Sequence, residues 1–156
     1  MKELISFFNS HRSEIWEQTQ EHLYLTLLAM SIATVIGVAL GVLLTRTKKL
    51  AAGTLGFVGV IQTIPSLALL GFLLPILGIG TTPAVVALFL YALLPIVRNT
   101  YTGISEIDPA VKEAAVGMGM TSSQLLRFVE LPIAFPVILA GIRTATVINV
   151  GIATLC

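Results

Sequence analysis

The chain has few charged residues and a single cysteine, and each shortage excludes a class of protein. Only 11% of its 156 residues are charged, 56% are hydrophobic, and the mean hydropathy is +0.96. A soluble domain carries about a quarter charged residues, so we expect lipid to surround most of this chain. Cys156 is the only cysteine, which excludes a disulfide within the chain and a cysteine-based metal cluster.

Motifs for catalysis and for nucleic-acid binding are also missing. The net charge is +1 and no basic patch with interleaved aromatics occurs, so nucleic acid is not an expected partner. The sequence has no G-x-x-x-x-G-K-[ST] nucleotide loop. No paired carboxylates and no Ser/His or Cys/His set lie in an apolar span. We therefore expect no enzyme activity, no cofactor and no metal.

Residues 1–22 are polar and carry four glutamates. A secretory signal has a basic region followed by an apolar core, so we expect no cleavable signal here. We predict an amphipathic helix that lies on the membrane surface, with Trp16 at the interface. A disordered tail is the alternative.

Four apolar stretches follow, and they predict an all-α, polytopic transmembrane helical bundle. A helix crosses a ~30 Å hydrocarbon core with about 20 residues, and most of these stretches reach that length. Small residues recur every fourth position in the first span, at Ala33, Gly37 and Gly41, which favours close approach of another helix. The predicted spans are 23–44, 55–77, 83–97 and 133–156.

Lysine and arginine indicate the orientation. Six of the nine lie at 46–49 or between 98 and 127, at what would be the same side of the membrane, whereas Lys2 and Arg12 lie on the other. Basic residues favour the cytoplasmic side. We therefore expect an external N-terminus and a cytoplasmic loop at 99–132, in the plasma membrane.

The 99–132 loop carries signals for two short helices. Asp108-Pro109 is typical of a helix start, because aspartate caps free N–H groups and proline suits the first turn. Gly119 is typical of a helix end. Thr121 and Gln124 form a capping-box pattern for a second helix. We expect the chain to turn into the last span at Pro132.

The same loop resembles the EAA loop of permease subunits of ABC importers. That pattern reads EAA, three residues, Gly, nine residues, Ile, one residue, Leu-Pro, and Val129 replaces the isoleucine here. The resemblance implies a coupling element that docks into a separate ATP-binding subunit; an ordinary helical hairpin is the alternative. The expected coupling residues are Glu113, Ala114, Ala115, Gly117, Met118, Gly119, Met120, Leu131 and Pro132.

Polar residues and prolines inside the spans suggest a translocation path. Pro65 cannot donate a hydrogen bond, so we expect a kink there and an unpaired carbonyl near Ile61. Arg143 is the only charge inside a span and is expected to face the bundle interior or water. Purely structural roles are the alternative. The candidate path residues are Gln62, Thr63, Pro65, Ser66, Tyr91, Arg143, Thr146 and Asn149, with Thr144, Thr146 and Asn149 on one polar side of the last span.

Three further segments, 61–70, 93–101 and 140–146, are similar to permeases of glycine betaine/carnitine/choline ABC importers of Gram-positive bacteria. The resemblance covers about residues 20–155. It implies a type I importer permease (MetI-like) fold over 23–156, with further spans beyond those present here. It also implies three partners: an ABC ATPase, a second permease subunit and an extracellular substrate-binding lipoprotein.

Two alternatives remain open from the sequence. Permeases for methionine or another amino acid share the loop and a proline in the second span. A truncated permease fragment that inserts but transports nothing is the other.

Overall fold

The structure, a computed structural model, describes residues 11–154, and every regular element in that range is helical. Three helices are long and apolar enough to cross a membrane, or four if the bent pair α3–α4 counts as one span. The predicted all-helical bundle is therefore confirmed. The elements are α2 (Arg12–Arg46), α3 (Lys48–Thr63), α4 (Ser66–Leu77), α5 (Thr81–Ser105), α6 (Pro109–Gly117), α7 (Ser122–Leu125), the π-helix η1 (Leu126–Glu130) and α8 (Leu131–Ala153).

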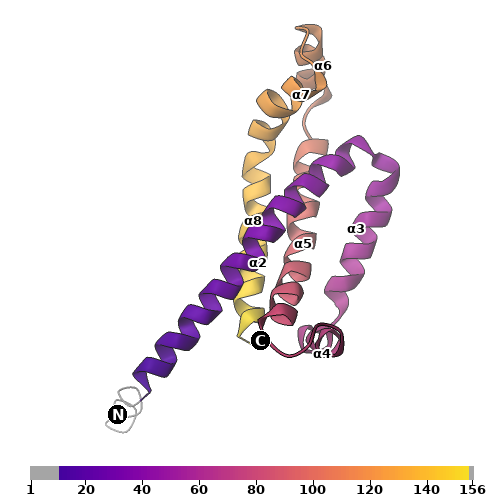
Figure 1. Cartoon of the computed structure of the whole chain (residues 1–156). Helices are drawn as coiled ribbons and strands as arrows, with labels where there is room; N and C mark the ends of the chain where they lie inside the picture. The colour runs from indigo at the N-terminus through magenta and orange to yellow at the C-terminus, as the bar shows by residue number, and fades with distance from the viewer. Residues whose placement is uncertain (1–10, 155–156) are drawn as a thin grey trace.

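Helix α5 forms the centre of the bundle (Figure 1). Helices α2 and α8 pack along it, and α3 and α4 contact it as well. The largest fully buried apolar side chains, Leu88, Ile96 and Ile104, all belong to α5. The α5 helix is therefore the scaffold against which the other spans are placed.

Small residues bring α2 and α8 close to α5. A Cβ atom added at Gly41 would lie 2.5 Å from Cβ of Thr100, and one at Gly141 would lie 2.8 Å from the carbonyl oxygen of Pro95. Both distances are shorter than van der Waals contact, so these positions require glycine. The close approach predicted for the Ala33–Gly41 row is confirmed, and its partner is α5.

The helix of the first span begins earlier than predicted. Helix α2 starts at Arg12 and continues without a break to Arg46, so residues 12–22 belong to the same helix as the predicted span and do not form a separate one. Residues 12–22 contain neither proline nor glycine and are rich in Glu and Gln, which favour helix, so nothing ends the helix near residue 22. The rest of the predicted surface segment lies outside the described residues.

The second span is broken rather than kinked. Helices α3 and α4 meet at an angle of 97°. Ile64 and Pro65 both leave the helix, with ψ angles of 129° and 138°. A proline disfavours the helical region for the residue before it, which explains why two residues become extended instead of one.

The third and fourth spans extend into the predicted loop 99–132. Helix α5 continues past Arg98 to Ser105, and Thr100 and Ile104 are fully buried. At the other end of the loop, residues 122–153 form one helical run through α7, η1 and α8, so the expected turn at Pro132 is absent. Arg98 suggested a span end, but the next two residues, Asn99 and Thr100, pack against Gly141 of α8 and Gly41 of α2.

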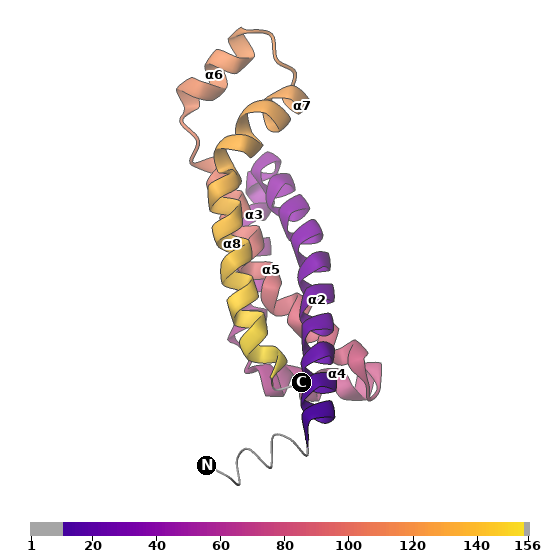
Figure 2. The same ribbon diagram turned by 90° about the vertical axis from the view of Figure 1, so that its left-hand side faces the viewer.

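The turn after α2 and the α6–α7 hairpin lie at one end of the bundle (Figures 1 and 2). The start of α2, helix α4 and the end of α8 lie at the opposite end. Most basic residues thus share one end, as the sequence predicts.

Candidate functional site

The first candidate site is the α6–α7 hairpin, and its first helix is fixed by local signals. The Asp108 side chain accepts a hydrogen bond from the N–H of Ala110 at 2.9 Å, and Pro109 occupies the first turn. At the other end Gly119 adopts φ = +84°. The N–H of Gly119 then donates to Val116 and that of Met120 to Ala115, which completes a Schellman cap. The predicted start and end of this helix are confirmed.

The second helix of the hairpin begins with the predicted capping box. The N–H of Thr121 donates to Oε1 of Gln124 at 2.8 Å, and the N–H of Gln124 donates to Oγ1 of Thr121 at 3.4 Å. Only four residues are α-helical before the backbone widens into η1, where the N–H of Leu131 reaches the carbonyl of Leu126. Single π turns are rare and occur often at functional sites.

Most of the predicted coupling residues lie together on the exposed hairpin (Figure 2). Met118 is 73% exposed, whereas Ala115 is buried and Met120 is half-buried. Leu131 packs against the buried cluster of Ile104, Ala134 and Ile138, and Pro132 is exposed on the first turn of α8. Of the predicted coupling residues in the hairpin, the exposed ones are Glu113, Ala114, Gly117, Met118 and Gly119.

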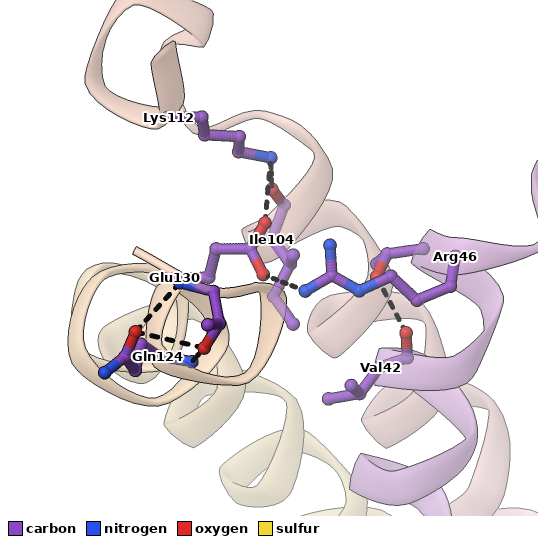
Figure 3. A network of polar contacts seen from close by, with 8 residues as sticks. Val42, Arg46, Ile104, Lys112, Gln124 and Glu130 are labelled. Atoms are coloured by element: carbon purple, nitrogen blue, oxygen red, sulfur yellow. Dashed lines mark hydrogen bonds and ion pairs between the residues drawn. The ribbon is translucent and has the colours of Figure 1, made fainter. Parts of the chain in front are cut away.

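Glu130 is a residue that the sequence analysis missed. Its side chain is buried, with Oε2 2.5 Å from Nη2 of Arg46 and Oε1 3.6 Å from Nζ of Lys112 (Figure 3). Lys112 also donates to the carbonyl of Ile104 at 2.8 Å. A buried carboxylate requires such partners, because its desolvation is otherwise too costly. The sequence did contain a signal for this burial, since Glu130 stands between two apolar residues, Val129 and Leu131.

The polar residues at the α3–α4 break are paired with each other and with α5. The expected unpaired carbonyl of Ile61 is not found, since it accepts from the N–H of Ile64 at 3.2 Å. The hydroxyl of Tyr91 donates to the carbonyl of Ile64, and Nε2 of Gln62 donates to the carbonyl of Tyr91 at 3.5 Å. In a regular helix the carbonyl of Tyr91 would accept a hydrogen bond from the N–H of residue 95, but Pro95 has no N–H. Gln62 and Tyr91 therefore form one group.

The remaining residues at this break take different positions. Thr63 is exposed, and its hydroxyl donates to the carbonyl of Val60 at 2.7 Å. Pro65 is exposed and Ser66 is half-buried. These three residues lie beside the Gln62–Tyr91 group.

The polar residues of α8 divide between two faces, contrary to the single polar side that we predicted. Arg143 and Thr146 are exposed, and Arg143 contributes to an open groove along this helix with Pro136 and Val147. Asn149 is fully buried, with Nδ2 3.1 Å from the carbonyl of Leu88. The break, the exposed face of α8 and the buried asparagine are thus three separate places in this chain.

Residues 11–154 contain no group of three or more His, Cys, Asp or Glu side chains placed to hold a metal ion.

Comparison with known proteins identifies relatives of both the sequence and the fold. Residues 24–156 match the family described as binding-protein-dependent transport system inner membrane component. The chain is 48% identical over 155 residues to the glycine betaine/carnitine/choline transport system permease protein OpuCB of Bacillus subtilis, covering 99% of this chain and 71% of that protein. It is 52% identical over 139 residues to the osmoprotectant import permease protein OsmW of Salmonella typhimurium, covering 86% of this chain and 65% of that protein.

A solved structure shares the fold. The inward-facing MetNI methionine ABC transporter matches with a TM-score of 0.82 and 27% sequence identity, covering 94% of this chain and 74% of the other. The helical arrangement described above is therefore that of a membrane subunit already known in an ABC transporter.

Proposed function

The chain belongs to the family of binding-protein-dependent transport system inner membrane components, and we propose that it is the permease subunit of an ATP-driven importer of quaternary ammonium osmoprotectants. Members of this family are multi-pass membrane subunits and not enzymes, and a separate subunit hydrolyses ATP. The observation that carries the substrate class is the 48% identity, over 155 residues, to a permease named for glycine betaine, carnitine and choline.

We assign coupling to the exposed face of the α6–α7 hairpin. Ala114 and Gly117 form a low surface that a groove of the ATPase can approach closely, and Met118 adds a flexible apolar contact. Gly119 supplies the left-handed turn that ends α6 beside this surface. Glu113 supplies one charge for a basic partner. Ala115 and Leu131 pack inward and hold the hairpin in place, while Met120 lies just before α7 and Pro132 lies in the first turn of α8.

The orientation follows from this assignment. An ATPase that binds the hairpin is cytoplasmic. The end of the bundle where α2 ends at Arg46 and where α6 lies with Lys112 therefore faces the cytoplasm. The start of α2 then faces outward, where a substrate-binding lipoprotein delivers the solute. This arrangement agrees with the preference of basic residues for the cytoplasmic side.

We assign the translocation path to polar groups of α8 and of the α3–α4 break. The exposed face of α8 with Arg143 and Thr146 is closed by a second permease subunit, since a lone arginine at membrane depth requires water or a partner. The α3–α4 break at Thr63, Pro65 and Ser66, braced by Gln62 and Tyr91, contributes irregular backbone that only a protein-lined cavity tolerates. Asn149 supports this path from within the packed core.

A permease for methionine is the second candidate. The fold similarity to the methionine transporter favours it, with a TM-score of 0.82. Its sequence identity is 27%, against 48% for the permease named for osmoprotectants, so the osmoprotectant class is the better supported.

The test is uptake of labelled glycine betaine, carnitine, choline and methionine by a host that lacks its own importers for them. The host carries the partner ATPase and binding protein, and expresses either the 156-residue chain or a form extended to the length of the Bacillus subtilis relative. We expect uptake of at least one quaternary ammonium solute by the extended form. Uptake of methionine alone assigns the chain to the second candidate, and no uptake by either form refutes both.

A further inference from the structure

We propose that Glu130 is a positioning residue for coupling, which ties the first helix of the hairpin to the end of the first span. Movement of the hairpin then reaches α2 as well as α8. The inference rests on the proposed function, because it presumes that the α6–α7 hairpin receives the ATPase. It concerns a residue that lies outside the exposed docking face.

The carboxylate of Glu130 joins three elements, and Lys112 extends the connection to a fourth. Glu130 ends η1, and its two oxygens face different helices: Oε2 contacts Arg46 of α2 and Oε1 faces Lys112 of α6 (Figure 3). Lys112 in turn donates to the carbonyl of Ile104 on α5. The three charged side chains are called the Glu130 cluster below.

Helix α6 depends on this cluster for its polar connection to the bundle. It packs chiefly against α7 and η1, which belong to the same hairpin. Lys112 is the residue that links α6 to α5 directly and to α2 through Glu130. Without the cluster, the hairpin would still be joined to α8 by the continuous helix, and Leu126 would still pack near Val42 of α2, but the ion pairs that tie the hairpin to Arg46 would be lost.

Burial makes the connection stiff. The Glu130 side chain is 2% exposed, whereas those of Arg46 and Lys112 are 41% and 27% exposed. Charge pairs interact more strongly away from water, and a buried charge that loses a partner is strongly disfavoured. Displacing α6 away from α2 separates Glu130 from one of its cations, so the two helices are expected to move together.

The decisive experiment measures ATP hydrolysed per solute imported. The form of the chain that transports in the uptake test is reconstituted in liposomes with its ATPase and binding protein. Glu130→Gln preserves the side-chain shape and removes its charge. We expect roughly tenfold lower uptake with ATP hydrolysis retained, the size of a typical coupling contribution. Glu106→Gln, which removes an exposed carboxylate at the end of α5, is expected to leave the ratio unchanged.

A second pair of variants tests the contact to α6. Lys112→Met removes the cation that faces Glu130, and Lys49→Met removes an exposed lysine at the same end of the bundle. We expect the ratio of ATP to solute to rise in the first and to stay at the wild-type value in the second. Equal ratios in both variants overturn the proposal.

A triple apolar variant separates coupling from folding. Buried ion pairs are often replaced by apolar side chains without loss of stability, so Arg46→Met, Lys112→Met and Glu130→Met together are expected to fold and assemble. We expect this variant to hydrolyse ATP and import solute poorly. Transport at the wild-type ratio shows that the cluster only fills space and refutes the proposal.

Hydrogen exchange supplies a readout that does not need transport. Glu130→Gln is expected to speed amide exchange both in 109–119 and at the end of α2 around 42–47, while Glu106→Gln is not. Unchanged exchange in both segments overturns the proposal even if transport is lost. If the unmodified complex shows no uptake, the proposed function is refuted. The hydrogen-exchange rates of the Glu130→Gln variant then still decide whether Glu130 ties α6 to α2.

Discussion

Gln62 and Tyr91 compensate for two prolines, Pro65 at the α3–α4 break and Pro95 inside α5. Pro95 leaves the carbonyl of Tyr91 without a helical donor, and Nε2 of Gln62 lies 3.5 Å from that oxygen. The hydroxyl of Tyr91 donates in return to the carbonyl of Ile64, which lies in the extended backbone before Pro65. Each helix thus supplies the hydrogen bond that the other lacks, and this fixes the broken span against α5.

Tyr91→Phe is expected to destabilise the protein by about 1–3 kcal/mol, because it leaves the part-buried carbonyl of Ile64 without its donor. The measurement is the midpoint of thermal unfolding in detergent, which should fall. Tyr101→Phe removes a half-buried hydroxyl from the same helix and serves as the control. Equal midpoints for the two variants would mean that the Tyr91 hydroxyl contributes nothing at the break.

Gly41→Ala and Gly53→Ala are expected to change stability in opposite directions. A Cβ at Gly41 would lie 2.5 Å from Thr100, and such overpacking costs about 1–3 kcal/mol. Gly53 lies inside α3 with nothing within 4 Å of an added Cβ, so alanine there should stabilise the helix by about 0.5–1 kcal/mol. Thermal unfolding of both variants checks this, and a stabilised Gly41→Ala protein would be incompatible with the α2–α5 contact.

Gly119→Val is expected to impair uptake, whereas Gly119→Asn retains most of it. Gly119 has φ = +84°, a conformation that costs an ordinary residue about 1–2 kcal/mol and that asparagine tolerates better. The strain distorts the end of α6 but leaves the bundle folded, so expression and thermal midpoint should change little. Uptake assays on both variants provide the test. Loss in both would mean that the absence of a side chain matters there, and not the backbone conformation.

Cysteines at Arg143 and Asn149 should differ in their reaction with a water-soluble thiol reagent. In a Cys156→Ser background, Arg143→Cys is expected to react in the assembled transporter, because its side chain lies on an exposed face assigned to the path. Asn149→Cys is expected to be protected, since that position is fully buried between α8 and α5. Protection of both positions would remove Arg143 from the path.

The parts of the structure that sequence analysis predicted well depend on local signals. Asp108, Gly119 and Thr121 fix the ends of α6 and α7 through bonds to residues at most a few positions away. The four-residue spacing of Gly37 and Gly41 likewise predicted close packing. Such features need no knowledge of the rest of the fold.

The features that sequence analysis missed depend on distant partners. Glu130 finds Arg46 across 84 positions of sequence, which no local pattern reveals. Pro65 indicated where the second span changes direction, but the 97° angle also requires Ile64 to leave the helix and Tyr91 to hold it. Asn149 continues the four-residue row of Gly141 and Ala145, and this spacing would have placed it on the packed face.

Uptake of labelled glycine betaine through the reconstituted transporter tests the central claim most directly. The transporter contains this chain, extended to the length of its relatives, with the ATPase and the binding protein. We predict ATP-dependent accumulation of glycine betaine, carnitine or choline, reduced roughly tenfold by Glu130→Gln. Accumulation of methionine with no quaternary ammonium solute would contradict the account.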